Sequence, residues 1–531
     1  MKASESTRRD FLKVMGVGAA AVSMPFAGRR AAAAINRRGD VKTQLRVDPK
    51  PKYELSPNLY MQFMEPLGTT DGSVQASWDF GRDCWREDLV EETSELAPTL
   101  LRFGGCFSSY YRWKEGVGPR DKRVPMLNML WGGLDPNQVG THEFVDFSRR
   151  VGAEPFYCVN FESDNRDYWK KDPKGSDRVG TAQEAAEWVD YCNNPKNALR
   201  REHGVEKPYN LKLWQLGNET SYDNIDIEWG GRKTVEFAKA MREVDPDLEL
   251  IGWGDWQHWE KQYWAKKMYE MAGDHIQYLA FHHMFNPSRG EDSPLRGIEY
   301  HKDPDKTWAH LMDAVKAHEG KVKGMYDECK DIPIPIALTE CHFALPGRNR
   351  CEVLSSWAAG VSYARMGLVH ERYGDKLKIA TMADFCGTRW QVNAVMIPVP
   401  GGHSFMMPVA RVMSLYRHHQ GEQAIDVTNT PDGLDVAASI TGNRVFLHVV
   451  NTQRTKAVDA TLAIDGKQIT GGKAFTLATD PEFEIYHHYE PKDDPLYPKE
   501  KAVPASGKWT FPAASVTAVE IDVEDTKESV A

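Results

Sequence analysis

Side chains that can transfer a proton or hold a polar ligand stand at the ends of several apolar segments. Glu219 follows the run WQLGN, and Glu340 follows the run PIALT. Asn160 ends the run FYCVN, and His282 follows YLAF. Two carboxyl groups at the ends of separate strands suit cleavage of a glycosidic bond, because one can protonate the leaving oxygen while the other attacks the anomeric carbon or activates water. A separation of about 5 to 5.5 Å would favour retention through a covalent intermediate.

Asn218 lies directly before Glu219, so its amide is placed to bond the 2-hydroxyl of a sugar, an interaction that strengthens in the transition state. The spacing of two glutamates is weak evidence by itself. The same pattern also fits a carbohydrate-binding protein that has kept the fold and lost turnover.

The elements that must position these residues follow a repeating pattern. From about residue 55 to 400, short apolar runs alternate with longer amphipathic ones, such as residues 181–193 and 233–244, the second opened by Gly-Gly-Arg. Repeated strand-then-helix units over about 300 residues favour a (β/α)8 TIM barrel, whose reacting groups lie at the carboxyl ends of the strands. An open sheet would be expected to carry a Gly-rich phosphate loop, and the sequence has none. The runs typical of buried parallel strands are 99–105, 154–161, 211–219, 248–255, 276–285, 334–340 and 377–385.

The pattern of apolar and polar residues changes after about residue 422. Segments such as LDVAASIT and RVFLHVVNT alternate apolar and polar residues and are separated by Gly, Asn, Asp and Pro. This pattern predicts a C-terminal β-sandwich domain at residues 416–531, after a catalytic barrel at 58–415. A strand-like segment within residues 39–57 can join the sandwich from the other end of the chain.

Residues 1–38 carry the pattern of a twin-arginine export signal and its linker. Arg8 and Arg9 precede an Ala/Gly-rich apolar run that is too short for a stable membrane span, and small residues follow at 31–34. An amphipathic first helix is the alternative. We expect a periplasmic or secreted mature protein without a membrane span.

Cysteine spacing and net charge limit the kinds of metal site and macromolecular partner that we expect. The eight cysteines show no Cys-x-x-Cys spacing, so we expect no zinc site. We also expect no cofactor and no metal, as the resemblance described below implies. Because twin-arginine substrates fold before they reach an oxidising compartment, we expect mostly free thiols and allow for one or two disulfides. The formal net charge of -10 is mild for 531 residues, and the absence of a basic patch argues against a nucleic-acid partner.

Five segments occur along the chain in the following order: ELSPNLYMQFMEPLG (54–68), LLRFGGCFSSYYRWKEGVGPRDKR (100–123), GTHEFVDFSRRVGAEPFYCVNF (140–161), KLWQLGNE (212–219) and MPVARVMSLYRHHQGEQAIDV (407–427). Together they resemble glycoside hydrolase family 51, the α-L-arabinofuranosidase family, in the clan of retaining (β/α)8-barrel glycosidases. The resemblance covers nearly all of the mature chain. It implies a barrel with a C-terminal β-sandwich, chemistry without a metal, and commonly a homo-oligomer.

The resemblance also implies roles for single residues. Glu219 matches the acid/base that follows Gly-Asn on strand four, and Glu340 matches the nucleophile on strand seven. We expect a nearby Arg102 to hold Glu340 ionised, and burial to raise the pKa of Glu219. Structural roles stay open for Glu65 and Arg102 as ion-pair partners and for His282 as a core histidine. The residues that match the substrate-binding set are Glu65, Arg102, Asn160, Asn218 and His282.

The chain departs from the family pattern around the sugar. Cys106 stands where many members have Asn, and Asp384 stands where they have Gln, so both are candidate substrate-binding residues. Asp384 could bond another hydroxyl and select a different furanose or a pyranose. Further departures are Cys341 and His342 in place of Trp and Asn, about Ala344 in place of a sugar-facing Trp, and Met284 or Phe285 at the position of an aromatic residue.

The sequence therefore predicts an exported, retaining glycoside hydrolase that acts on a carbohydrate and releases furanosyl residues, most simply α-L-arabinofuranosyl residues. Two alternatives stay open. The first keeps the mechanism and changes the bond cleaved, to another pentofuranoside, a galactofuranoside, a β-xyloside or an internal linkage. The second is a non-catalytic carbohydrate-binding protein.

Overall fold

The computed structural model of the chain describes residues 43–222, 225–256, 263–285, 293–345, 351–488 and 494–526. The predicted export signal at residues 1–38 lies outside these described residues. Within them, no helix is both long enough and apolar enough to cross a membrane. All eight cysteines fall in the described ranges, and all are free thiols.

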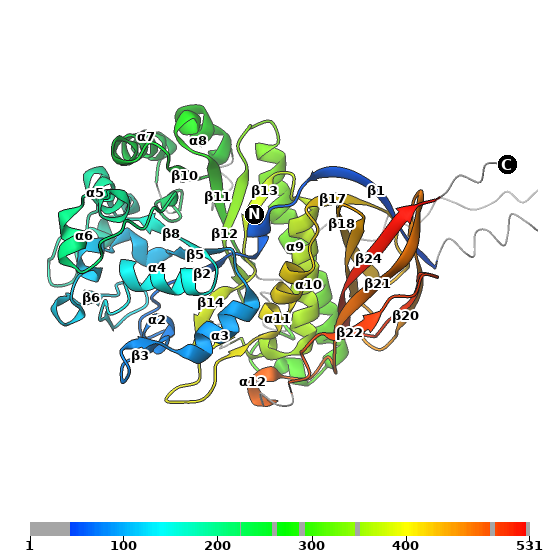
Figure 1. Cartoon of the computed structure of the whole chain (residues 1–531). Helices are drawn as coiled ribbons and strands as arrows, with labels where there is room; N and C mark the ends of the chain where they lie inside the picture. The colour runs from blue at the N-terminus through cyan, green and yellow to red at the C-terminus, as the bar shows by residue number, and fades with distance from the viewer. Residues whose placement is uncertain are drawn as a thin grey trace, which may run out of the picture. The chain divides into compact units, whose positions relative to one another are not determined.

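Eight parallel strands form one curled sheet, which confirms the predicted barrel (Figure 1). Seven of them match the predicted apolar runs, whereas the first and shortest was not predicted as a strand. The curl closes where Met61, just before the first strand, donates its N–H to the carbonyl of Ala380 on the last strand at 2.9 Å. The strands in spatial order are β2 (Gln62–Met64), β5 (Leu100–Phe103), β8 (Glu154–Val159), β9 (Leu213–Leu216), β10 (Glu249–Trp253), β11 (Tyr278–Phe285), β12 (Ile336–Phe343) and β13 (Leu377–Ala380).

The longer helices alternate with these strands. The predicted helix at 181–193 corresponds to α5 (Ala182–Asn193), whose N-terminus is capped by the Thr181 hydroxyl accepting from the Glu184 N–H at 3.1 Å. The other longer helices are α3 (Glu87–Leu96), α4 (Thr141–Arg150), α7 (Ile227–Val244), α8 (Trp264–Ala272), α9 (Pro304–Cys329), α10 (Trp357–Arg372) and α11 (Pro408–His418).

Helix α7 begins earlier than the sequence pattern predicts. The Gly-Gly-Arg interpreted as its start lies inside it, and the two glycines face α8. A Cβ on Gly231 would lie 2.6 Å from the Met271 side chain, and one on Gly230 would lie 3.3 Å from the Trp264 ring. These glycines therefore allow close helix packing, although glycine disfavours a helix interior locally.

The C-terminal region forms a nine-stranded sheet around its own apolar core, as the alternating pattern predicts. Strand β1 (Gln44–Glu54) belongs to this sheet, because it pairs antiparallel with β17 (Gln423–Asn429) and parallel with β20 (Val458–Ile464). Figure 1 shows this N-terminal strand, in blue, beside the orange and red strands. The other strands are β18 (Leu434–Thr441), β19 (Arg444–Asn451), β21 (Lys467–Ala478), β22 (Lys499–Ala502), β23 (Lys508–Phe511) and β24 (Ser515–Asp525).

Short elements fill the loops at the ends of the barrel strands. The largest of them is a three-stranded sheet that follows β13 in the chain. Its strands in spatial order are β14 (Asp384–Gly387), β15 (Asn393–Met396) and β16 (Phe405–Met406). Other short elements, besides further 3-10 turns, are η1 (Pro57–Tyr60), α2 (Ser73–Ala76), β3 (Trp78–Asp79), β4 (Cys84–Trp85), β6 (Met126–Leu127), β7 (Leu134–Asp135), α6 (Ala198–Glu202) and α12 (Ile485–His488).

Tryptophan side chains tie the barrel helices to the C-terminal sheet. Trp357, at the start of α10, is fully buried and donates its indole N–H to the carbonyl of Ala514 at 2.6 Å. Trp308 in α9 donates in the same way to the carbonyl of Thr452 at 3.1 Å. The two regions therefore share buried hydrogen bonds.

We expect Trp357→Phe to lower the free energy of unfolding by about 1–3 kcal/mol, because the buried carbonyl of Ala514 loses its donor. Urea denaturation followed by fluorescence and circular dichroism measures this change. Trp509→Phe is a matched control, since the indole N–H of Trp509 has no hydrogen-bond partner among the described residues. An equal loss of stability in both variants would contradict a role for the Trp357 hydrogen bond.

Candidate active site

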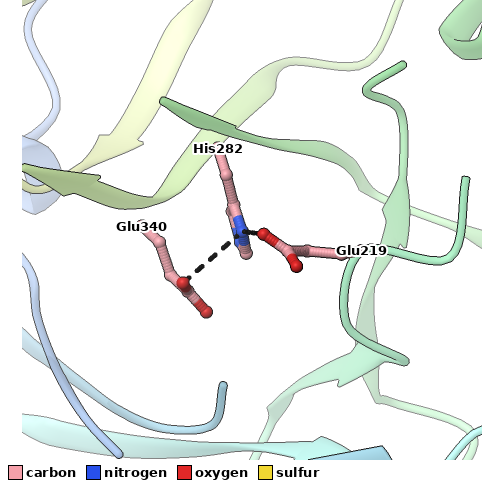
Figure 2. Close-up of side chains that lie close together, drawn as sticks. All are labelled: Glu219, His282 and Glu340. Atoms are coloured by element: carbon pink, nitrogen blue, oxygen red, sulfur yellow. Dashed lines mark hydrogen bonds and ion pairs between the residues drawn. The ribbon is translucent and has the colours of Figure 1, made fainter. Parts of the chain in front are cut away.

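Three side chains meet at the carboxyl ends of neighbouring barrel strands. Glu219 follows β9, His282 lies in β11 and Glu340 lies in β12. His282 Nδ1 is 3.0 Å from Glu219 Oε1 and 3.6 Å from Glu340 Oε2, and Figure 2 shows the imidazole between the two carboxyl groups. One oxygen of Glu219 lies within 4.8 Å of one oxygen of Glu340. The predicted carboxyl pair is thus brought together.

An irregularity in the pairing of β11 with β12 aligns two of these residues. Phe281 pairs with Leu338, but the next residue, His282, pairs with Glu340, so Thr339 is the extra residue on β12. His282 Nε2 contacts the hydroxyl of this Thr339 at 3.0 Å. The bulge therefore places His282 beside Glu340 and fixes the imidazole from its other side.

Arg102 in β5 is fully buried and binds three side chains through its guanidinium group. Nη1 donates to Glu340 Oε1 at 2.7 Å, Nη2 donates to Asn218 Oδ1 at 2.8 Å, and Nε donates to Gln215 Oε1 at 2.9 Å. These bonds connect β5, β9 and β12. Arg102 therefore places a fully buried positive charge directly against the Glu340 carboxyl group.

The backbone at Glu219 has an unusual conformation for a residue with a side chain. Its φ is 55°, in the left-handed region, and Gly217 before it has φ 74°. Asp164 Oδ1 accepts the Asn218 N–H at 3.3 Å, and Arg166 donates to the carbonyl of Glu219 at 2.8 Å. These contacts hold the turn that directs the Glu219 carboxyl group toward His282.

Asn160 is bonded to backbone groups at the end of β8. Its amide nitrogen donates to the carbonyls of Tyr111 at 3.1 Å and Arg178 at 2.8 Å, and its oxygen accepts the Ser163 N–H at 3.0 Å. These bonds fix the loop that supplies Asp164. The role of Asn160 as a substrate-binding residue stays a prediction.

Glu65, Cys106 and Asn218 lie around the carboxyl pair. Glu65 Oε1 accepts the indole N–H of Trp131 at 2.9 Å. Cys106 Sγ is 3.7 Å from Glu219 Oε2 and 3.9 Å from the amide nitrogen of Asn218. Cys106 thus contacts both Glu219 and Asn218, and the roles of Glu65, Cys106 and Asn218 in substrate binding stay predictions.

Burial shifts the acid–base properties of the site. Burial raises the pKa of Glu219 from 4.5 to about 7, and burial together with the charge of Glu340 raises the pKa of Glu65 to about 8. Burial, then the charges of Glu340 and Glu65, raises the pKa of Asp384 well above its usual range. Burial lowers the pKa of His282 to about 4. The site therefore combines carboxyl groups of raised pKa with the Arg102–Glu340 ion pair and an imidazole of lowered pKa.

Glu219, His282 and Glu340 are also the one group, among the residues that the structure describes, whose ligand atoms lie close enough together to hold a metal ion. The guanidinium of Arg102 already occupies one oxygen of Glu340 at 2.7 Å. Its positive charge opposes binding of a second cation nearby, so these residues suit acid–base chemistry better than metal binding.

Several supporting residues were not found from the sequence. Gln215 is a polar residue within an apolar strand, and this signal marks it as an inward-facing partner. Asp164 and Arg166 lie in a loop with no periodicity, and Trp131 and Trp390 reach the site from loops far apart in the chain. No pattern in the sequence predicts these loop positions.

The family model and the sequence relatives described below are α-L-arabinofuranosidases. A family model described as "Alpha-L-arabinofuranosidase 1 domain" matches residues 92–291. A probable α-L-arabinofuranosidase C of Aspergillus niger is 35% identical over 213 residues, 37% of this chain and 38% of that protein. An intracellular exo-α-(1→5)-L-arabinofuranosidase of Acetivibrio thermocellus is 31% identical over 303 residues, 54% of this chain and 57% of that protein. The chain thus matches less than two thirds of the length of these relatives.

Solved structures match over most of the chain. The thermostable family 51 α-L-arabinofuranosidase of Thermotoga petrophila covers 90% of this chain, with a TM-score of 0.72 and 22% identity. The α-L-arabinofuranosidase of Thermotoga maritima in complex with arabinose also covers 90%, with a TM-score of 0.69 and 24% identity. At these identities the likeness shows the fold. By the match of residues 92–291 to the α-L-arabinofuranosidase domain model and by its sequence relatives, the chain is similar to α-L-arabinofuranosidases, and it shares the fold of glycoside hydrolase family 51 structures.

Proposed function

We propose that this protein is a retaining glycoside hydrolase that releases α-L-arabinofuranosyl residues from oligosaccharides or polysaccharides. The observation that carries the proposal is the carboxyl pair: two glutamates have oxygens within 4.8 Å of each other, one paired with a buried guanidinium and the other with a raised pKa. This separation fits double displacement, because inverting enzymes need about 6.5–9.5 Å to admit a water molecule.

In the first step, Glu340 attacks the anomeric carbon while the protonated Glu219 donates its proton to the leaving oxygen. The glycosidic bond breaks, and an ester bond forms between the sugar and Glu340. In the second step, the Glu219 carboxylate takes a proton from water, whose oxygen attacks the same carbon and displaces Glu340. Two inversions give net retention, and both glutamates return to their starting states.

Neighbouring groups serve these two steps. Arg102 holds Glu340 in its nucleophilic, ionised form through a hydrogen bond of 2.7 Å. His282, neutral because burial lowers its pKa, contacts Glu219 at 3.0 Å and orients its carboxyl group. The amide nitrogen of Asn218 lies 3.9 Å from Cys106 Sγ, and we infer that it bonds the 2-hydroxyl of the sugar.

The choice of sugar is supported by the names of the relatives, which are arabinofuranosidases. A second candidate keeps the mechanism and changes the sugar. It is favoured by Asp384 and His342, which differ from the family pattern and lie near Glu340. A non-catalytic binding protein is the weaker alternative, because it would have no need for an acid with a raised pKa beside a paired carboxylate.

We expect Glu219→Gln and Glu340→Gln to respond differently to the leaving group. Glu219→Gln should lose about 10²–10⁴-fold in kcat/KM on an alkyl arabinofuranoside, since its leaving oxygen needs a proton. The loss should be far smaller on a dinitrophenyl arabinofuranoside, whose leaving group is a stable anion. Glu340→Gln should lose activity on both substrates, because it lacks the nucleophile.

Azide provides the matched control for these variants. It should rescue Glu340→Gly by forming a glycosyl azide in place of the ester. Full activity of either Gln variant on the alkyl substrate would contradict the proposed mechanism, and product of inverted configuration from the wild-type enzyme, seen by NMR, would contradict retention.

The pH dependence of kcat/KM should show that Glu219 acts as the proton donor. The active form of Glu219 is protonated, so kcat/KM should fall as pH rises through about 7, the pKa set by burial. On a dinitrophenyl substrate, which needs no proton, this decrease should be absent. Hydrolysis of both substrates at several pH values measures the effect, and an identical alkaline decrease for both would show that another group titrates.

Export is a separate proposal that rests on Arg8 and Arg9 in the first residues of the sequence. One relative is named intracellular, so location must be measured for this chain. Replacing both arginines by lysine should retain a fused reporter in the cytoplasm, because twin-arginine recognition requires the arginine pair. Equal export of the wild-type and variant fusions would refute the proposal.

A further inference from the structure

A buried ion pair links helix α9 to the backbone of the site. Asp255 lies just after β10, and its exposed fraction is 1%. Its Oδ1 accepts the backbone N–H of Trp256 at 2.7 Å and a hydrogen bond from Nζ of Lys321 in α9. Its Oδ2 accepts the backbone N–H of His282 at 3.3 Å. Both oxygens are bonded within the protein, so Asp255 supports His282 rather than a ligand.

The register of β10 and β11 brings Asp255 to His282. Trp253, the last residue of β10, pairs with Ala280 of β11. The N–H of the next residue, Gly254, donates to the carbonyl of Ala280 at 2.8 Å. The parallel pairing therefore continues past the end of β10, and it places Asp255 beside the backbone N–H that it accepts.

Trp253 supports the imidazole ring of the same histidine. The ring centres of Trp253 and His282 are 4.6 Å apart, and the ring planes are at 85° to each other. The indole N–H of Trp253 donates to the hydroxyl of Ser221 at 2.8 Å, two residues after Glu219. The end of β10 thus holds the ring of His282 through Trp253 and its backbone through Asp255.

Lys321 allows an acid to be buried at this position. The side chain of Lys321 is 22% exposed, and its Nζ lies 5.4 Å from the centre of the Trp256 ring. A buried carboxylate without a cation costs several kcal/mol, whereas a bonded pair has no net charge. The lysine from α9 is therefore the partner that lets Asp255 accept the N–H of His282.

We propose that Asp255 and Lys321 are positioning residues for the proton donor of the reaction. Lys321 holds Asp255, Asp255 fixes the backbone of His282, and the imidazole of His282 holds the Glu219 carboxyl group at 3.0 Å. Neither positioning residue touches the substrate. The inference rests on the proposed glycoside hydrolase function, in which Glu219 is the acid.

The charge of Asp255 also acts on Glu219. Burial is the largest cause of the raised pKa of Glu219, the positive charges of Arg166 and Arg102 oppose it, and the negative charge of Asp255 adds to it. Without that negative charge, Glu219 should lose its proton at a lower pH. Without the positive charge of Lys321, it should lose its proton at a higher pH. Other titratable groups that face Glu219 or Asp255 are Cys106, Asp164, Tyr222, His282, Glu328 and Glu340.

The test compares Asp255→Asn, Lys321→Met and the double variant in the full-length enzyme, with kcat/KM on an alkyl arabinofuranoside measured across pH. The alkaline decrease should move to lower pH in Asp255→Asn, by about half a pH unit or more, and to higher pH in Lys321→Met. In the double variant it should return close to the wild-type position, because both charges are gone. An unmoved decrease in Asp255→Asn would overturn the proposal.

A second measurement separates the contact from the charge. The Asn amide offers one acceptor oxygen where the carboxylate offers two, so the hold on His282 is weakened. At its optimum pH, Asp255→Asn should lose about 10-fold in kcat/KM on the alkyl substrate, and the double variant should keep this loss. On a dinitrophenyl arabinofuranoside, whose leaving group needs no proton, little should be lost. An equal loss on both substrates would refute a role that acts through the proton donor.

Lys323→Met is the matched control for removal of a positive charge from α9. Lys323 lies two residues after Lys321 and pairs with Asp327, but 58% of its side chain is exposed. Its replacement should leave the pH profile unchanged, because exposed charges are screened by water and salt. Circular dichroism and thermal melting check the fold of each variant. If Asp255→Asn does not fold, Lys321→Met carries the test, and the absence of its shift to higher pH would refute the proposal.

The two proposals fail in different ways. If the wild-type enzyme hydrolyses no glycoside, the proposed function fails, and the positioning role fails with it. If the wild type is active and neither Asp255→Asn nor Lys321→Met moves its alkaline decrease, hydrolysis stands and the positioning role is refuted.

Discussion

The buried guanidinium of Arg102 is the interaction on which the site depends. A fully buried cation is stable only when its donors are satisfied, and this one binds Glu340, Asn218 and Gln215. Its three partners come from two strands on either side of the barrel axis. The requirement to satisfy one charge thus fixes the relative positions of strands that are more than a hundred residues apart in the sequence.

The positive charge of Arg102 also distinguishes Glu340 from the other carboxyl groups of the site. Glu340 is paired with the cation, whereas Glu219, Glu65 and Asp384 share buried surroundings without a comparable partner. Burial and like charges in a poorly solvated site oppose further ionisation, so the pKa values of these groups are raised. The site thereby holds one carboxyl group in an ion pair and several carboxyl groups of raised pKa.

Loops after the barrel strands fix the backbone at Glu219 and at Trp390. The turn at Glu219 has a left-handed backbone, and Asp164 and Arg166 from the loop after β8 bond to it. On the opposite side, Asp71 holds the loop of Trp390 in the same manner. In both places a buried acid accepts backbone N–H groups, so irregular segments are fixed as firmly as the strands that they follow.

The sequence by itself determined the barrel, the C-terminal sheet and the carboxyl pair, because strand and helix periodicities are local and because Glu219 and Glu340 end apolar runs. Only the tertiary structure decided the rest. The bulge at Thr339 that aligns His282 with Glu340, the occupied amide of Asn160 and the meeting of Trp131 with Trp390 depend on contacts between distant segments. The raised pKa of Asp384 depends on burial among other acids, which no local pattern of residues encodes.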